Sequence, residues 1–132
     1  KVKVALQIFN CIQSIDRAKL VNEIAKHQTK ALSKTKNYFI QVNIGKEIQK
    51  SGVLPEDLKN LYNLCLEKKL KIIGLMCIPP INKSSKEFFY EMKLIRDNLN
   101  RELTLSMGMS DDYKISLECE SNLIRIGSRI FK

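Results

Sequence analysis

The segment Ser106–Asp112 combines residue types that suit the binding of a phosphate group. An apolar strand ends there at Gly108, which permits a tight turn, and Ser110 then presents a hydroxyl where a helix is expected to begin. The free amides and the positive dipole end of a helix N-terminus bind anions without any side-chain charge. A second interpretation is that Ser110 only caps this helix, while Asp111 and Asp112 suit its dipole.

A second segment with potential chemistry, Leu123–Phe131, lies near the end of the chain. Arg125 interrupts an apolar strand there, and Gly127 and Ser128 open what could be one helical turn. An arginine bordered by isoleucines is costly unless it is paired, so Arg125 requires an anionic or acceptor partner at the strand end. Barrels of eight βα units commonly bind phosphate with the loops after their last two strands and a short extra helix. The two segments would lie there if the chain holds strands four to eight, which favours the phosphate interpretation.

The elements that must position these segments alternate between short apolar runs and longer stretches of helical periodicity, as in βα units around a parallel sheet. The expected strands are Cys11 to Ile15, Tyr38 to Ile44, Lys71 to Ile78, Leu103 to Met107 and Leu123 to Ile126. The expected helices are Arg17 to Leu32, one that starts at Pro55, about Ser85 to Arg101, and Asp111 to about Glu120. Residues 1–10 could be the end of a preceding helix.

Individual residues refine these helices. Asp16 is well placed to cap the first one, and Pro55 is a favoured first helical position. The inner face of the second helix is expected to contain Leu58, Leu61, Tyr62 and Cys65, and that of the third Phe88, Met92, Ile95 and Leu99.

Five βα units leave two α/β architectures open. They are too few for a closed (β/α)8 TIM barrel, so a barrel would need three further strands upstream. The alternative is an open, doubly wound sheet of five strands, whose ligands would also lie at the carboxyl ends of the strands. Residues 1–132 read as one globular domain, and the lack of an initial Met favours a fragment of a longer one.

Composition argues against several classes of function. The four cysteines stand far apart and His27 is the only histidine, so we expect neither a metal site nor a Ser-His triad. We expect the cysteines to be reduced, buried thiols of a cytoplasmic protein. No segment approaches the roughly 18 apolar residues that span a bilayer, and the start does not read as a signal peptide.

The net charge of +9 is unevenly distributed, since residues 1–36 carry 8 basic and 2 acidic side chains. This basic stretch offers only Phe9 as an aromatic partner for bases, so lysines on a solvated face are the expected interpretation and nucleic acid is not an expected partner. Binding to nucleic acid or an anionic membrane is a third hypothesis, which strongly salt-dependent binding would support.

Four segments, in order along the chain, resemble the pyridoxal phosphate homeostasis proteins, also called the YggS/PROSC family. They are Lys50–Gly52 after the strand Gln41–Ile44, Gly74–Pro79, Leu105–Asp112 and Ile124–Ser128. The resemblance covers essentially the whole chain. It implies a TIM barrel of the alanine racemase type, here a partial barrel with about strands 4 to 8, and pyridoxal 5'-phosphate as the cofactor. It further implies a cytoplasmic carrier or buffer of that cofactor, a monomer when intact, without established catalysis and with apo-enzymes as candidate recipients.

Residue by residue, the resemblance assigns Ser110, Gly127, Ser128 and the amide of Ile126 to the cofactor phosphate, and Arg125 to the pyridine nitrogen. A guanidinium only donates hydrogen bonds, so Arg125 would keep that nitrogen unprotonated and weaken the ring as an electron sink. Carbanion chemistry should then be slow. The alternative, an amino-acid racemase or decarboxylase of the same barrel class, needs a second acid or base over the ring.

The resemblance also implies a Schiff-base lysine at the end of the family's first strand, and this chain starts downstream of that strand. The segment Leu32–Lys36 looks like the lysine motif, but it stands between a helix and a strand on the opposite face of a barrel, so we interpret it as chance. Lys50, Asn43 and Met76 could face the cofactor; a solvent-exposed lysine and ordinary core residues are the alternative interpretation.

Overall fold

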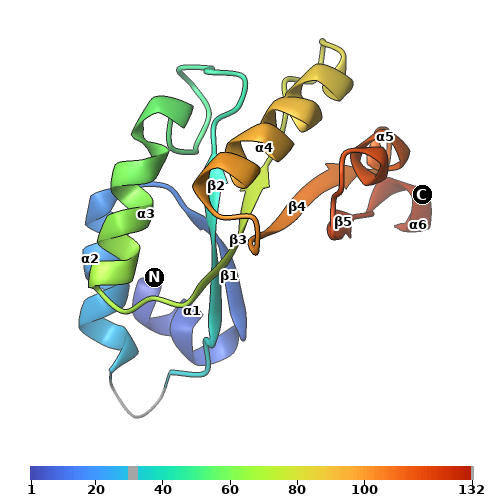
Figure 1. Ribbon diagram of the computed structural model, residues 1–132. Coiled ribbons are helices and arrows are strands. Elements are labelled where there is room, and N and C mark those ends of the chain that lie inside the picture. Colours follow the sequence, from blue (N-terminus) through green and yellow to red (C-terminus); the bar gives the residue numbers. More distant parts are fainter. Residues whose placement is uncertain (30–32, 132) are drawn as a thin grey trace.

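The computed structural model describes residues 1–29 and 33–131, and in this part of the chain the strands form one parallel sheet (Figure 1). The strands are β1 (Cys11–Ile15), β2 (Asn37–Val42), β3 (Ile72–Cys77), β4 (Thr104–Met109) and β5 (Leu123–Arg125). They pair in the order β1-β2-β3-β4-β5, and every pair is parallel. A doubly wound sheet reverses its strand order at a switch point, whereas a (β/α) barrel adds strands in sequence. The doubly wound alternative is therefore wrong.

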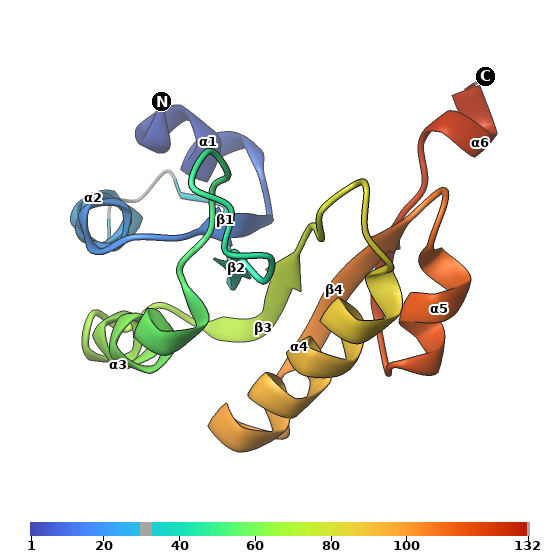
Figure 2. The same cartoon turned by 90° about the horizontal axis from the view of Figure 1, so that it is seen from above.

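The helices give the sheet a covered and an open side. They are α1 (Val2–Ile8), α2 (Ala18–Gln28), α3 (Leu58–Glu67) after the 3-10 turn η1 (Pro55–Asp57), α4 (Ser85–Leu99), α5 (Tyr113–Glu118) and α6 (Ser128–Phe131). Viewed from above, the sheet curves and α2 to α5 lie along its convex side (Figure 2). The fold is thus an α/β half-barrel.

The expected strands are confirmed with shifts at their ends. β1 has the expected bounds, whereas β2 ends at Val42 because Asn43 turns the chain. The Asn43 side chain donates to the carbonyl of Glu47 at 2.7 Å and accepts from the Glu47 amide at 3.1 Å. β4 continues to Met109, which pairs with Arg125 of β5.

The first expected helix is confirmed as α2, but its predicted cap is wrong. α2 follows Arg17 without a side-chain cap, and the expected residues 30–32 lie outside the described residues. The carboxylate of Asp16 instead accepts from Arg17 Nη1 at 2.7 Å and from the amide of Gly52 at 3.1 Å. Asp16 therefore ties the end of β1 to the loop after β2.

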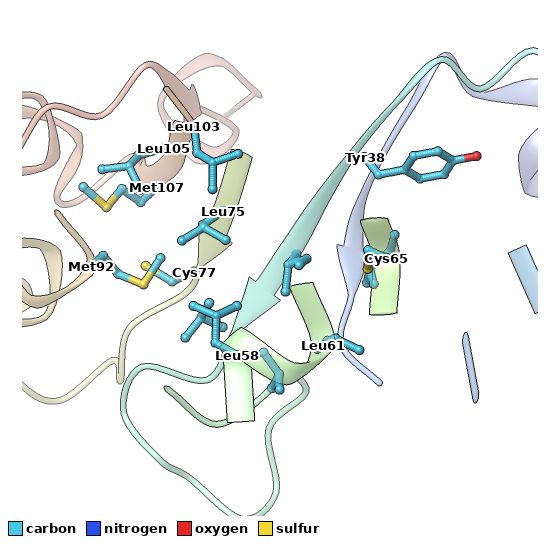
Figure 3. Close-up of a cluster of buried hydrophobic side chains, with 14 of the residues drawn as sticks. Tyr38, Leu58, Leu61, Cys65, Leu75, Cys77, Met92, Leu103, Leu105 and Met107 are labelled. Atoms are coloured by element: carbon cyan, nitrogen blue, oxygen red, sulfur yellow. The ribbon is translucent and has the colours of Figure 1, made fainter. Parts of the chain in front are cut away.

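The core lies between the convex side of the sheet and the helices. Figure 3 shows part of it, including Tyr38, Leu75, Leu105 and Met107 from the strands and Leu58, Leu61, Cys65 and Met92 from the helices. Phe39 and Met76 are also buried but are not part of this cluster, as expected for strand residues that alternate toward the concave side.

The inner face of α4 differs from the expected one. Phe89 and Met92 are fully buried, while Phe88, Ile95 and Leu99 are only partly buried. The reason is Arg96, which is 6% exposed and completes the three- and four-residue spacing from Phe89. Its guanidinium donates to the carbonyl of Leu103 at 2.9 Å, to Glu120 at 2.9 Å and to Asp97 at 2.7 Å. A paired arginine thus takes a place that an apolar residue was expected to fill.

The remaining expectations concern the cysteines, membrane-spanning segments and metal sites. Cys65, Cys77 and Cys119 are buried, Cys11 is half-buried, and all four are free thiols. Within residues 1–29 and 33–131, no helix has the length and apolar character needed to cross a bilayer, and no cluster of metal-ligating side chains is present.

Candidate functional site

The two segments singled out from the sequence meet at the carboxyl ends of β4 and β5. Ser110 follows β4 directly, and its Oγ accepts the amide N–H of Gly127 at 3.3 Å and that of Arg129 at 3.4 Å. The Arg129 side chain donates from Nε to the carbonyl of Ser110 at 3.0 Å. Two backbone amides at the start of α6 therefore converge on a single neutral oxygen, at distances longer than the usual 2.9 to 3.0 Å.

The interpretation of Ser110 as a cap of its own helix is wrong. α5 begins at Tyr113 after Asp112, without a side-chain cap. The Asp112 carboxylate instead accepts from the Met109 amide and from the Ser85 hydroxyl, both at 2.8 Å. The amides that meet the Ser110 hydroxyl belong to Gly127, just before α6, and to Arg129, in the first turn of α6, so Ser110 joins the last two βα units.

The two glycines of the site have different roles. Gly108 has a positive φ of 105°, and a Cβ there would overlap the Ser116 hydroxyl. It therefore allows β4 to turn closely against α5. A Cβ on Gly127 would meet nothing within 4 Å, so the backbone of Gly127 borders open space beside Ser110.

Arg125 has the acceptor partners that its apolar surroundings require. Its Nη1 donates to Ser106 Oγ at 2.6 Å and its Nη2 to the carbonyl of Cys77 at 3.0 Å. The guanidinium is half-buried, and burial lowers its pKa, whereas Cys77 and Asp112 act in the opposite direction. Burial also raises the pKa of the Cys77 thiol to about 12. The prediction of a paired arginine is confirmed, and the thiol beside it is a neutral core group.

Sequence reasoning missed Gln13 as part of this site. Ser106 is fully buried, and its hydroxyl donates to Gln13 Oε1 at 2.6 Å while it accepts from Arg125. Gln13 lies on β1, 93 residues before Ser106. A polar residue inside the apolar run Leu105–Met107 was the available signal for Ser106, but no local signal indicates its partner.

A cavity of about 510 Å³ opens beside Arg125. Its lining is mainly apolar, with acidic and hydroxyl groups at one side: Cys77, Ile78, Pro79, Pro80, Ile81, Ser84, Ser85, Gly108, Met109, Asp111, Asp112, Ile115 and Arg125. Of the residues singled out from the sequence, Gly108 and Arg125 line this cavity, whereas Ser110, Ile126, Gly127 and Ser128 do not. A mainly apolar cavity with a few polar groups is typical of a small-molecule site.

The donor set fits a phosphorylated aromatic group. Ile126, Gly127 and Ser128 lie in and directly after the turn that leads to α6, next to Ser110, and Arg125 precedes them. Backbone amides, a hydroxyl and open space at Gly127 suit a phosphate, and the adjacent guanidinium suits a ring acceptor.

Among the described residues, the side chains of Lys50, Asn43 and Met76 make no hydrogen bond to Ser110, Arg125 or Gly127. Lys50 pairs with Glu47 at 2.9 Å and donates to the carbonyl of Pro79 at 3.4 Å, so it is anchored in its loop. Asn43 is occupied by Glu47, and Met76 is buried. Of the lysine-like segment 32–36, Leu32 lies outside the described residues. Residues 33–36 directly precede β2, at the end of the sheet opposite the site.

A parallel sheet whose strands add in chain order, with helices along its convex side, defines an α/β half-barrel of the (β/α) type. Comparison with known proteins makes the assignment more specific. The chain belongs to the family described as alanine racemase, N-terminal domain, which matches residues 1–132.

Two curated relatives carry the name that the motifs led us to expect, pyridoxal phosphate homeostasis protein. The one from Aquifex aeolicus is 37% identical over 99% of this chain and 61% of its own length. The one from Helicobacter pylori is 40% identical over 92% of this chain and 56% of its own length. This chain thus spans about three fifths of the relatives that it matches.

Solved structures agree with this assignment. PipY of Synechococcus elongatus, solved without pyridoxal phosphate, superposes with a TM-score of 0.88 at 25% identity over all of this chain and 66% of PipY. PipY solved with pyridoxal phosphate bound gives a TM-score of 0.80 at 26% identity, over 100% of this chain and 65% of PipY. A viral arginine decarboxylase, with a TM-score of 0.69 and 10% identity, shows a shared fold alone.

Proposed function

We propose that this chain is the part of a pyridoxal-phosphate-binding barrel that holds the phosphate and the ring nitrogen of the cofactor. In this proposal β1 to β5 are about strands 4 to 8, and residues 1–132 form the C-terminal part of a single domain. The sequential sheet order and the three-fifths coverage of its relatives support this placement. The observation that carries it is the convergence of the Gly127 and Arg129 amides on Ser110 beside the paired guanidinium of Arg125.

The proposed roles follow from the donors present. Ser110, Gly127, Ser128 and the amide of Ile126 hold the phosphate, and Arg125 donates to the pyridine nitrogen. The cofactor supplies a reactive aldehyde and, where its ring nitrogen is protonated, an electron sink. The guanidinium of Arg125 only donates hydrogen bonds and keeps its proton, so it orients the ring without protonating the ring nitrogen. This supports a carrier or buffer of the cofactor over a racemase or decarboxylase.

The proposal also covers the cellular location of the protein, its partners and its oligomeric state. Four free thiols support the cytoplasm as its location. The recipients of the cofactor would be apo-enzymes that bind it more tightly, and the protein would act as a monomer. The resemblance places the Schiff-base lysine upstream of residue 1, so tests of binding belong in the full-length protein.

The experiment is a titration of the full-length protein with pyridoxal phosphate and with pyridoxal, which lacks the phosphate, followed by absorbance of the retained cofactor. The wild type should prefer pyridoxal phosphate. Ser110→Ala should reduce this preference, whereas Arg125→Ala should lower the affinity for both ligands by the same factor. One lost charge-assisted hydrogen bond of about 1.5–3 kcal/mol corresponds to roughly a 10- to 100-fold loss of affinity.

Arg101→Ala is the matched control, because Arg101 is exposed after α4. It should bind both ligands as the wild type does. Unchanged affinity in both Ser110→Ala and Arg125→Ala would refute the assignment of the site, and a wild type that retains no cofactor would refute the function itself.

A further inference from the structure

A chain of hydrogen bonds crosses the concave side of the sheet from β1 to β5. Gln13 on β1 accepts from Ser106 on β4 at 2.6 Å, and Ser106 accepts from Arg125 on β5 at 2.6 Å. β1 and β4 are separated by two strands in the sheet order, so this contact spans the hollow of the half-barrel. Figure 2 shows the curvature that brings the two strands toward each other.

The direction of the Arg125–Ser106 bond is fixed by chemistry, and that of the Ser106–Gln13 bond by the orientation of the Gln13 amide, whose oxygen faces Ser106. Arg125 can only donate, so the Ser106 oxygen must present a lone pair to it. The Ser106 hydroxyl has a single hydrogen, and Gln13 Oε1 accepts it. Because Gln13 takes this hydrogen, the hydroxyl lone pairs stay directed at the guanidinium. Cys77 holds the second Nη group through its carbonyl at 3.0 Å, so two fixed acceptors define the plane of the guanidinium.

We propose that Gln13 is a positioning residue for the cofactor site, which acts through Ser106 to hold Arg125 in the orientation that meets the ring nitrogen. The inference rests on the proposed function, since it concerns the orientation of Arg125 toward the pyridine ring. It adds a strand from the other side of the half-barrel to a site otherwise built from β3, β4, β5 and the segments that follow them. Gln13 does not itself touch the cofactor in this proposal.

The test uses variants of the full-length protein. Gln13→Leu removes the acceptor and keeps a side chain of similar size, so Ser106 loses its fixed orientation and Arg125 one of its two fixed acceptors. We expect a roughly 3- to 10-fold weaker affinity for pyridoxal phosphate, equivalent to part of one hydrogen bond to a charged group. The absorbance band of the retained cofactor should also change, because it reports the environment of the ring. Gln13→Glu keeps the acceptor and should restore affinity and spectrum.

The matched control is Gln41→Leu. Gln41 is a half-buried glutamine on β2, and among the described residues its side chain makes only a long bond of 3.5 Å to the Ser51 carbonyl, outside the hydrogen-bond chain of Gln13, Ser106 and Arg125. This variant should leave the affinity and the spectrum unchanged.

A double-mutant cycle separates positioning from a structural role. If Gln13 acts through Arg125, Gln13→Leu should cost nothing further in an Arg125→Ala background, since residues that act as a unit are not additive. If Gln13 only joins β1 to β4, the loss should persist in that background and the melting temperature of the apo-protein should fall. That second result would overturn the inference.

The outcomes also distinguish the inference from the function on which it rests. Weak binding in Arg125→Ala together with wild-type affinity and spectrum in Gln13→Leu would overturn the role of Gln13 and leave the cofactor site standing. Absence of cofactor binding by the wild type would overturn the proposed function and the inference together.

Discussion

Substitution of Gly127 by alanine should separate cofactor binding from stability. A Cβ at this position meets no atom within 4 Å, and the residue is exposed. The change should therefore alter the free energy of unfolding by less than about 0.5 kcal/mol, as is usual for surface positions. If the phosphate lies against the amides beside Ser110, however, the new methyl group occupies the space that the phosphate needs.

The magnitude of the binding loss follows from the bonds at stake. A methyl group that keeps the phosphate away from even one amide removes a hydrogen bond to a charged group, about 1.5–3 kcal/mol. That corresponds to a roughly 10- to 100-fold weaker affinity for pyridoxal phosphate, with little change in the affinity for pyridoxal. Titration of the full-length protein with both ligands, beside urea unfolding of the apo-protein, measures the two quantities.

Gly108→Ala provides the opposite control. Its φ of 105° and the overlap of a Cβ with Ser116 predict a loss of stability in the apo-protein, of about 1–2 kcal/mol for the backbone alone. Wild-type affinity of Gly127→Ala for pyridoxal phosphate would refute the placement of the phosphate. Unfolding of Gly127→Ala would refute the open space described beside this residue.

Two further predictions concern the buried arginine of α4. Arg96→Met should lower the free energy of unfolding by about 2–3 kcal/mol, because the buried carbonyl of Leu103 loses its donor, while Lys86→Met at an exposed site of α4 should change it little. Equal urea midpoints for both variants would contradict this. The hydrogen bond from Arg96 holds the pKa of Asp97 below its ordinary value of 3.8. In acid the unfolded state therefore binds more protons than the folded state does. The stability that Asp97 contributes is lost as the pH falls below about 4. Urea unfolding between pH 3 and pH 6 should show a shallower acid dependence in Asp97→Asn, and an unchanged slope would exclude this contribution.

Much of the site could be predicted from local sequence. Gly108 and Ser110 after one strand, and Arg125 in the next strand with Gly127 and Ser128 after it, were assigned to one site because barrels bind phosphate with the loops after their last two strands. The structure confirms that these residues meet. It corrects the role of Ser110, whose partners lie 17 and 19 residues further along the chain. A capping pattern describes only the next turn of backbone, so it could not identify amides from another βα unit.

The buried faces of the helices were also predicted only in part from local sequence. Leu58, Leu61 and Cys65 are buried as their spacing predicts, because apolar side chains at helical intervals form one face of the helix, which packs against the sheet. In α4 the spacing selected Phe88, whereas the structure buries Phe89. The choice depends on Arg96, because its acceptors Leu103, just before β4, and Glu120, after α5, come within its reach only when the sheet has formed.

The sequence by itself determined the alternation of strands and helices, the order of the motifs and the residue types that follow the last two strands, since these follow from local periodicity and turn chemistry. Only the tertiary structure decided that the strands add in one direction and that the sheet curves. Curvature brings Gln13 within 2.6 Å of Ser106 across 93 residues, and thereby connects the first strand to Arg125. The physical reason is that the distance between β1 and β4 depends on the twist between each pair of neighbouring strands, added over the whole sheet. The local sequence of any one strand does not predict this total.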